Sequence, residues 1–92
     1  MNIAIADDHP LFRGGVRTLL EATDDLVVVG EAGTGAEAIR LAETVRPDVL
    51  VLDLRLPDVN GIEVAERLTA QLPDLRILIL SMHKDDKRFS RR

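Results

Sequence analysis

Four polar side chains of this sequence could do chemistry together, because each follows directly on a short apolar run: Asp7, Asp8, Asp53 and Ser81. The apolar runs are residues 2–6, 49–52 and 75–80. If each run is a strand of one parallel sheet, the carboxyl ends of the strands meet at one edge, where open α/β folds place their ligands. The spacing therefore predicts that these polar groups share one edge of a sheet.

Carboxylates gathered at one edge repel each other, so a cation is expected among them. Oxygen ligands alone favour a hard ion, Mg²⁺ or Mn²⁺. With a hydroxyl such as that of Ser81, this set suits phosphoryl chemistry, and Asp53 could itself form an aspartyl phosphate. The alternative for any single acid is structural, since Asp8 could simply cap the helix that follows it.

The elements that must position these groups alternate along the chain. Strands are predicted at residues 2–6, 26–30, 49–54 and 75–80, with a turn at 32–35. Between them lie three helical stripes expected to face a core: Phe12, Val16, Leu19 and Leu20; Ala38, Ile39, Ala42 and Val45; Ile62, Ala65, Leu68 and Leu72. This β-α-β-α-β-α-β order predicts a parallel sheet with right-handed crossovers and helices on both faces.

Length and charge narrow the function classes. Ninety-two residues make one small domain, and the formal net charge is −4. Residues 84–92 carry a local charge of +3, which leaves −7 on the rest and argues against nucleic acid as the main partner. The sequence has no cysteine for disulfide or zinc–thiolate chemistry, and it shows no membrane helix and no signal peptide. These features predict a soluble cytoplasmic domain.

Three segments of the chain carry a resemblance to a known family: residues 5–10, 51–61 and 79–81. They resemble the receiver domain of two-component response regulators. The opening Asp-Asp-His-Pro-Leu-Phe-Arg and the segment Ser-Met-His at 81–83 are most similar to the NarL/LuxR subfamily, and the match covers roughly residues 2–83.

The resemblance implies a fold and a set of roles. The fold is the flavodoxin-like (CheY-like) doubly wound sheet, with strand order 2-1-3-4-5. Asp53 matches the phosphoacceptor, Asp8 the direct Mg²⁺ ligand, and Asp7 its neighbour, which often acts through water. Arg55 occupies the position whose backbone carbonyl binds the metal, and Ser81 matches the hydroxyl that senses the phosphoryl group. A sensor histidine kinase would supply that group, so the domain is expected to be a phosphoacceptor rather than an enzyme with turnover.

This chain departs from the family after its fourth predicted strand. The family's fifth strand, the lysine that follows it and the DNA-binding output are expected to be absent, which gives a truncated receiver at residues 1–83 and a frayed or disordered charged tail at 84–92. Strand four would become an exposed apolar edge at residues 77–80, which predicts a homodimer, with local disorder or aggregation at this edge as the alternative. The competing function is an interaction fragment that is never phosphorylated.

Other sites fit the sequence less well. Residues 33–38 match a dinucleotide-binding fingerprint between a strand and a helix, but Glu31 beside it would repel a pyrophosphate. Phosphatases of the haloacid dehalogenase class need an acid two residues after the nucleophile, where Arg55 stands. His9 is expected to line the acidic edge and His83 to lie in solvent, while Arg13 and Arg17 are expected to form a solvated helix face.

Overall fold

The computed structural model describes residues 1–80, which form one parallel four-stranded sheet in the order β2-β1-β3-β4. The strands are β1 (Asn2–Ala6), β2 (Val27–Ala32), β3 (Val49–Asp53) and β4 (Arg76–Leu80). Every neighbouring pair is parallel. The predicted fold class and the order 2-1-3-4 are confirmed.

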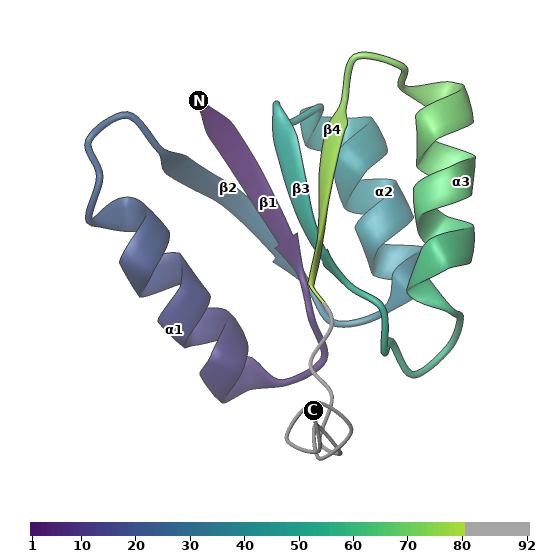
Figure 1. The fold of residues 1–92 in the computed structure, drawn as a ribbon, viewed down its shortest axis with the longest axis horizontal. Coiled ribbons are helices and arrows are strands. Elements are labelled where there is room, and N and C mark those ends of the chain that lie inside the picture. Colours follow the sequence, from purple (N-terminus) through teal and green to yellow (C-terminus); the bar gives the residue numbers. More distant parts are fainter. Residues whose placement is uncertain (81–92) are drawn as a thin grey trace, which may run out of the picture.

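Three helices cover the sheet: α1 (Pro10–Glu21), α2 (Gly35–Val45) and α3 (Gly61–Gln71). Helix α1 lies on one face, and α2 and α3 lie side by side on the other (Figure 1). Helices on both faces were predicted from the alternation of elements and are confirmed. None of the helices among residues 1–80 is long and apolar enough to span a bilayer.

Local sequence signals explain where the helices begin and end. Pro10 starts α1, where its missing N–H costs nothing. Thr34 caps α2 by accepting a hydrogen bond from Glu37 N at 3.1 Å, and Asn60 caps α3 through Ile62 N at 2.8 Å. Helix α2 ends at Arg46, which adopts a left-handed φ of 47° before the proline that follows.

The larger part of the core lies between the sheet and helices α2 and α3. Alternate residues of the central strands point to this face, and they pack against small and branched helix residues. The most deeply buried members, each 0–1% exposed, are Ala4, Ala6, Leu50, Leu52, Ala38, Ala42, Val64 and Leu68. This face therefore fixes the positions of α2 and α3 on β1 and β3.

The smaller part of the core lies under α1. It is built from Ile3, Ile5, Val28 and Val51, against which the half-buried Val16 and Leu20 of α1 pack. No residue of α1 is fully buried. The two faces of the sheet are therefore unequal in how tightly they hold their helices.

Two residues expected in the core are exposed: Leu19 is 75% and Ile62 is 48% accessible. At 100° per residue, Leu19 points away from the side of α1 that carries Val16, Leu20 and Arg13. Ile62 is displaced because Gly61 and Val64 occupy the side of α3 that faces the sheet. The predicted stripes were therefore wrong at these two positions.

The second strand is shifted relative to the prediction. β2 extends to Ala32, which pairs with Ala6 and accepts a hydrogen bond from Asp7 N at 2.9 Å. The predicted turn at 32–35 is therefore shortened, and Gly35 already belongs to α2. Pairing with the end of β1 outweighs the turn preference of the glycine-containing segment.

Candidate functional site

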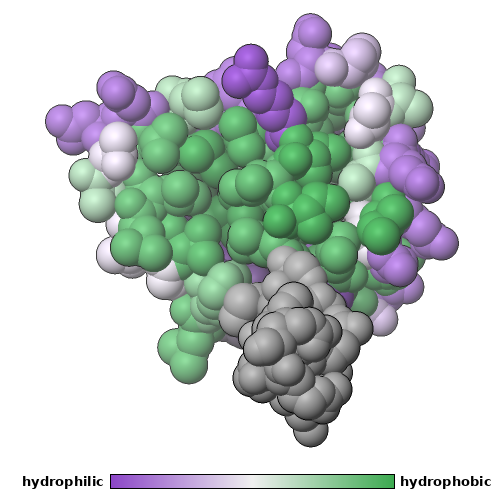
Figure 2. Space-filling view, viewed as in Figure 1, coloured by the Kyte–Doolittle hydropathy of each residue, from purple (hydrophilic) through white to green (hydrophobic). Residues whose placement is uncertain are grey.

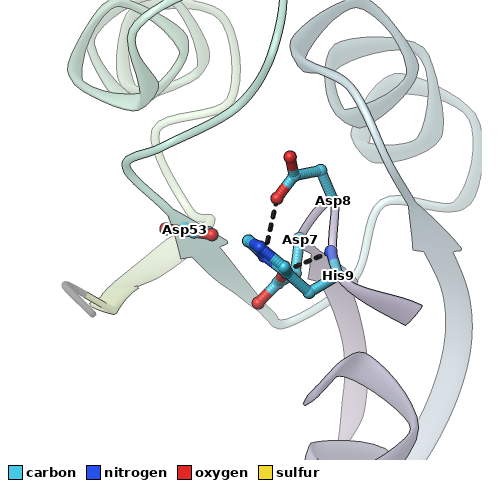
Figure 3. Close-up of side chains that lie close together, drawn as sticks. All are labelled: Asp7, Asp8, His9 and Asp53. Atoms are coloured by element: carbon cyan, nitrogen blue, oxygen red, sulfur yellow. Dashed lines mark hydrogen bonds and ion pairs between the residues drawn. The ribbon is translucent and has the colours of Figure 1, made fainter. Parts of the chain in front are cut away.

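Two loops at the carboxyl ends of the strands bring acidic side chains together. Asp7, Asp8 and His9 come from the loop after β1, and Asp53 comes from the end of β3 (Figure 3). One ligand atom from each of these four residues lies within 4.8 Å of all the others. Ser81, the fourth polar group predicted at this edge, lies outside the described residues.

The two most buried acids are held by backbone amides. The side chain of Asp7 is 2% exposed and its Oδ1 accepts a hydrogen bond from His9 N at 2.7 Å. Asp53, also 2% exposed, accepts one from Arg55 N at 3.0 Å through its own Oδ1. Oδ2 of Asp7 is buried without a hydrogen-bond partner. A buried, unpartnered carboxylate oxygen beside two further acids fits a divalent cation, since burying such an oxygen alone is costly.

Asp8 and His9 form the outer side of the cluster. Oδ1 of Asp8 lies 2.8 Å from Nδ1 of His9, an ion-pair contact when the imidazole is protonated. The imidazole is 65% exposed and the Asp8 side chain 31% exposed. The site is therefore buried on the side of Asp7 and Asp53 and open to solvent on the side of His9.

An arginine braces the first loop. Arg13 of α1 donates hydrogen bonds to the carbonyl oxygen of Asp7 and, through Nε, to Glu31 Oε1 at 2.8 Å. Its side chain is only 21% exposed, so the expectation of a solvated face was wrong for this residue. The end of β1 leaves a carbonyl group that needs a donor, and Arg13 reaches it from the first turns of α1. Asp7 is thereby tied to both α1 and β2.

Glu31 joins both arginines of α1 to the sheet. Arg17 also donates to its carboxylate, although the Arg17 side chain is 45% exposed. Partial burial opposes ionisation of Glu31, but the hydrogen bonds from Arg17 and Arg13 outweigh it and hold its pKa below the usual range. Glu31 is therefore a structural anion.

An aspartate that the sequence reasoning did not single out braces the second loop. Asp58 accepts hydrogen bonds from Gly35 N at 2.7 Å and from Ala36 N at 3.0 Å, at the start of α2. These backbone donors lower the pKa of its carboxyl group. In the sequence, Asp58 appears only as an acid in a proline-containing loop. Its hydrogen-bond partners lie more than twenty residues away, so this local pattern does not predict them.

The loop after Asp53 is also closed on itself. Gly61 N donates to the carbonyl of Leu54 at 3.0 Å, and Arg55 forms an isolated bridge with Asn60. A Cβ on Gly61 would lie 2.6 Å from both the backbone oxygen of Asp53 and the Cα of Leu54, so only glycine fits at this position. These contacts fix the backbone that carries Asp53 and Arg55.

The dinucleotide alternative does not survive the geometry. The amides of Gly35 and Ala36 are occupied by Asp58, and that of Glu37 by Thr34. Gly33 N donates to Glu37 Oε1 at 2.9 Å. All four amides at and just before the start of α2 are therefore bound by side chains of the chain itself, including Asp58 from the loop before α3, and are not free for a pyrophosphate.

A parallel sheet with helices on both faces, and with carboxylates gathered at the ends of β1 and β3, defines an open α/β protein whose ligand site lies at the carboxyl edge of the sheet. The family model described as the response regulator receiver domain matches residues 3–91. The chain belongs to the response regulator receiver domain family. The resemblance seen in the sequence is confirmed.

Individual relatives agree with this assignment. The chain is 48% identical over 87 residues to the DNA-binding transcriptional activator DevR/DosR of Mycobacterium tuberculosis, covering 95% of this chain and 40% of that protein. It is 41% identical over 86 residues to the nitrate/nitrite response regulator protein NarL of Escherichia coli K12, covering 91% and 40%. The crystal structure of a LuxR-family two-component response regulator from Aurantimonas superposes with a TM-score of 0.85 at 38% identity, covering 97% of this chain and 64% of that one.

The chain matches only part of each of these relatives, so the comparison applies to that part alone. The chain spans about two fifths of the length of the two curated relatives above. It is the receiver domain of a two-component response regulator, and relatives of this kind are transcriptional regulators. Receiver domains are regulatory modules that generally bind Mg²⁺ at a group of acidic residues and are phosphorylated by histidine kinases.

Proposed function

We propose that this chain accepts a phosphoryl group on Asp53, with Mg²⁺ bound beside it, from a sensor histidine kinase. The observation that carries the proposal is the buried carboxylate of Asp53, which shares one small acidic cluster with Asp7 and its buried, unpartnered oxygen. Burial on the sheet side and access on the His9 side suit a group that must meet a large phosphodonor and a small cation together.

Each residue has a part in the transfer. Arg55 N–H holds Oδ1 of Asp53, which leaves the other oxygen to attack phosphorus while the bond to the donor nitrogen breaks. Asp8, Asp53 and the carbonyl of Arg55 would hold the metal, with Asp7 acting through water. An ion held there would neutralise charge on the phosphoryl oxygens. The hydroxyl group of Ser81 would then donate a hydrogen bond to the new phosphoryl group.

In a longer protein of this family, the receiver would control a transcriptional output. The name of DevR/DosR describes a DNA-binding activator, and we extend that role to the protein that carries this receiver. Residues 1–83 carry a net negative charge, which disfavours DNA binding. This charge supports a DNA-binding function located on another part of the protein. We place the receiver at residues 1–83 and assign residues 84–92 to a separate charged segment.

The decisive test is phosphorylation with a small donor. The untagged chain is incubated with Mg²⁺ and acetyl phosphate, or with beryllofluoride, and followed by intact mass or by spectral change. We expect a modification that Asp53→Asn removes and that Asp48→Asn keeps, since Asp48 lies at the opposite end of β3 and accepts a hydrogen bond from Asn2 N. An unmodified wild-type chain in the presence of Mg²⁺ would reject the proposal.

One observation favours a second role, self-association through β4. This strand has one hydrogen-bonded neighbour within the described sheet, and Leu78 and Ile79 are 55% and 40% exposed. A broad apolar surface surrounds it on the side of the molecule seen in Figure 2. An edge of this kind favours pairing with a second copy. Light scattering should show a dimer that Leu78→Lys weakens, and a stable wild-type monomer at micromolar concentration would refute this role.

A further inference from the structure

We infer that the pair Asn60 and Gly61 is a site of spontaneous deamidation, which the folded loop keeps closed. The modification goes beyond the proposed function, because it involves neither a metal nor a phosphoryl group. A glycine after an asparagine favours this reaction, since no side chain hinders the approach of the glycine nitrogen to the asparagine side chain. The sequence has one other asparagine, Asn2, and the branched Ile3 follows it.

The reaction is an internal acyl transfer between neighbouring groups. The backbone nitrogen of Gly61 bonds to Cγ of Asn60, the bond from Cγ to the side-chain nitrogen breaks, and ammonia leaves with the proton that the backbone nitrogen gives up. Water then opens the five-membered imide ring at one of its two carbonyl carbons. Opening at the side-chain carbonyl gives aspartate, and opening at the main-chain carbonyl gives isoaspartate, in which the chain runs through the side chain.

The folded loop holds the reacting groups away from this ring. Ring closure brings Gly61 N into line with Cβ of Asn60, which requires a ψ of about −120° at Asn60, outside the main allowed regions. Asn60 has a ψ of 132°. The peptide group that follows would therefore have to rotate by roughly 110°. That rotation would break the hydrogen bond from Gly61 N to the Leu54 carbonyl, which is 3.0 Å long.

The side chain of Asn60 is held as well, because its Oδ1 accepts a hydrogen bond from Ile62 N at 2.8 Å. Residue 60 is exposed, so water is at hand once the loop opens. Deamidation of the folded chain should therefore proceed only from the open loop, at a rate set by the fraction of molecules that are open.

Packing requires the same glycine that makes the pair reactive. A Cβ at position 61 would lie 2.6 Å from the backbone oxygen of Asp53, so the loop needs glycine there. The absence of a side chain lets the loop close against β3, and it also leaves Gly61 N free of steric hindrance in any open state. Protection of the pair then depends on the hydrogen bonds of the closed loop.

The two products should affect the loop differently. Aspartate at position 60 still caps α3 and places a negative charge at the start of that helix, where it is favourable. Isoaspartate adds one carbon to the main chain between the bridge of Arg55 with Asn60 and the amide of Gly61. The hydrogen bond from Gly61 N to Leu54 then loses its register. Isoaspartate is thus expected to loosen the loop that carries Asp53.

The test follows deamidation of the full chain, folded in buffer or unfolded in guanidinium chloride at the same mildly alkaline pH. Intact mass reports the conversion of amide to acid, and peptide mapping assigns it to Asn60 or Asn2 and separates aspartate from isoaspartate. We expect Asn60 to react at least about 100-fold faster in the unfolded chain than in the folded chain, with Asn2 slow in both. Equal rates at Asn60 in the two states, or a reaction at Asn2 as fast as at Asn60, would overturn the inference.

A pair of variants tests whether loop opening controls the rate. Asp58→Ala removes the contacts from the loop to Gly35 and Ala36, and the folded rate at Asn60 should rise at least about threefold. Asp74→Ala, at the far end of the sheet, should keep the rate of wild type. A rate in folded Asp58→Ala equal to that of wild type would overturn loop opening as the controlling step.

The separated products test the consequence for the loop. The refolded isoaspartate chain should unfold at a lower temperature than Asn60→Asp, and equal unfolding temperatures would overturn the expected loosening. Where the proposed function holds, the isoaspartate chain should also lose the modification of Asp53 by acetyl phosphate, and Asn60→Asp should keep it. A wild-type chain that takes no phosphoryl group would reject the proposed function alone, because the deamidation rates and unfolding temperatures still decide this inference.

Discussion

The two faces of the sheet hold their helices in different ways. On the face of α2 and α3, fully buried side chains such as Leu52 and Leu68 pack into one continuous cluster. On the other face, α1 has no fully buried residue and is held through Arg13 and Arg17, which bind Glu31. The loop that carries Asp53 thus rests on the packed face, and the Asp7–Asp8 loop depends on polar contacts. The difference teaches that the two halves of one site can be stabilised by different forces.

Shortening one leucine to alanine on each face should give the largest difference in the free energy of unfolding between the two faces. Leu68→Ala removes a fully buried side chain of α3 and is expected to lower the free energy of unfolding by about 2–5 kcal/mol. Leu20→Ala on α1 removes a half-buried side chain and should cost roughly 1 kcal/mol. Urea denaturation followed by circular dichroism measures both. Equal losses would show that the faces are packed alike.

Glycine-to-alanine changes should have opposite signs on the two faces. Gly61→Ala forces a methyl group against the Asp53 carbonyl and is expected to destabilise by about 1–3 kcal/mol. Gly15→Ala in the middle of α1 meets nothing within 4 Å and should stabilise by about 0.5–1 kcal/mol. Thermal unfolding of each variant gives the sign. A destabilised Gly15→Ala would place unseen contacts on α1.

The brace formed by Asp58 should influence metal binding without touching the metal. Asp58→Ala frees the loop that carries Asp53 and Arg55 from α2, and the Mg²⁺ affinity is expected to fall roughly tenfold. Asp58→Asn retains one acceptor oxygen, so its Mg²⁺ affinity should lie between those of wild type and Asp58→Ala. Asp74→Asn, at the far end of the sheet, is the matched control. Unchanged Mg²⁺ affinity in Asp58→Ala would mean that the loop holds its position unaided.

Acid should weaken both braces together. The pKa values of Glu31 and Asp58 are lowered in the folded chain from ordinary values of 4.5 and 3.8. Their stabilising effect is therefore complete above those values and is lost as the pH falls through the lower folded values. Unfolding measured along a pH series should show a smaller acid loss in Glu31→Gln than in wild type. Identical pH dependence would show that Glu31 contributes nothing through its charge.

The smallest effect is expected on the outer side of α1. Leu19 is 75% exposed, so Leu19→Ser should change the free energy of unfolding by less than about 0.5 kcal/mol. Leu50→Ser is the contrasting variant, because its side chain is fully buried at the centre of the sheet. A large loss of stability in Leu19→Ser would reveal that this side of α1 is covered.

By itself, the sequence determined the order of strands and helices and the edge on which the acids lie. Apolar runs of strand length followed by Asp7 and Asp53 have few other solutions, because parallel strands bring their carboxyl ends to one edge. Pro10 acts on its own backbone, so the start of α1 is a local property of the sequence, whereas the capping roles of Thr34 and Asn60 became clear only in the structure. The roles expected of individual residues came from the resemblance to the family's motifs, because these patterns alone do not indicate them.

Only the tertiary structure decided which side of each helix faces the sheet and what holds the loops of the site. Leu19 and Ile62 continue an apolar spacing but point outward, because Arg13 and Gly61 set the rotation of their helices. The contact from Asp58 to Gly35 joins residues 23 positions apart. Contacts of this kind depend on strand order and crossover placement, which are global properties, and no local pattern of residue types encodes them.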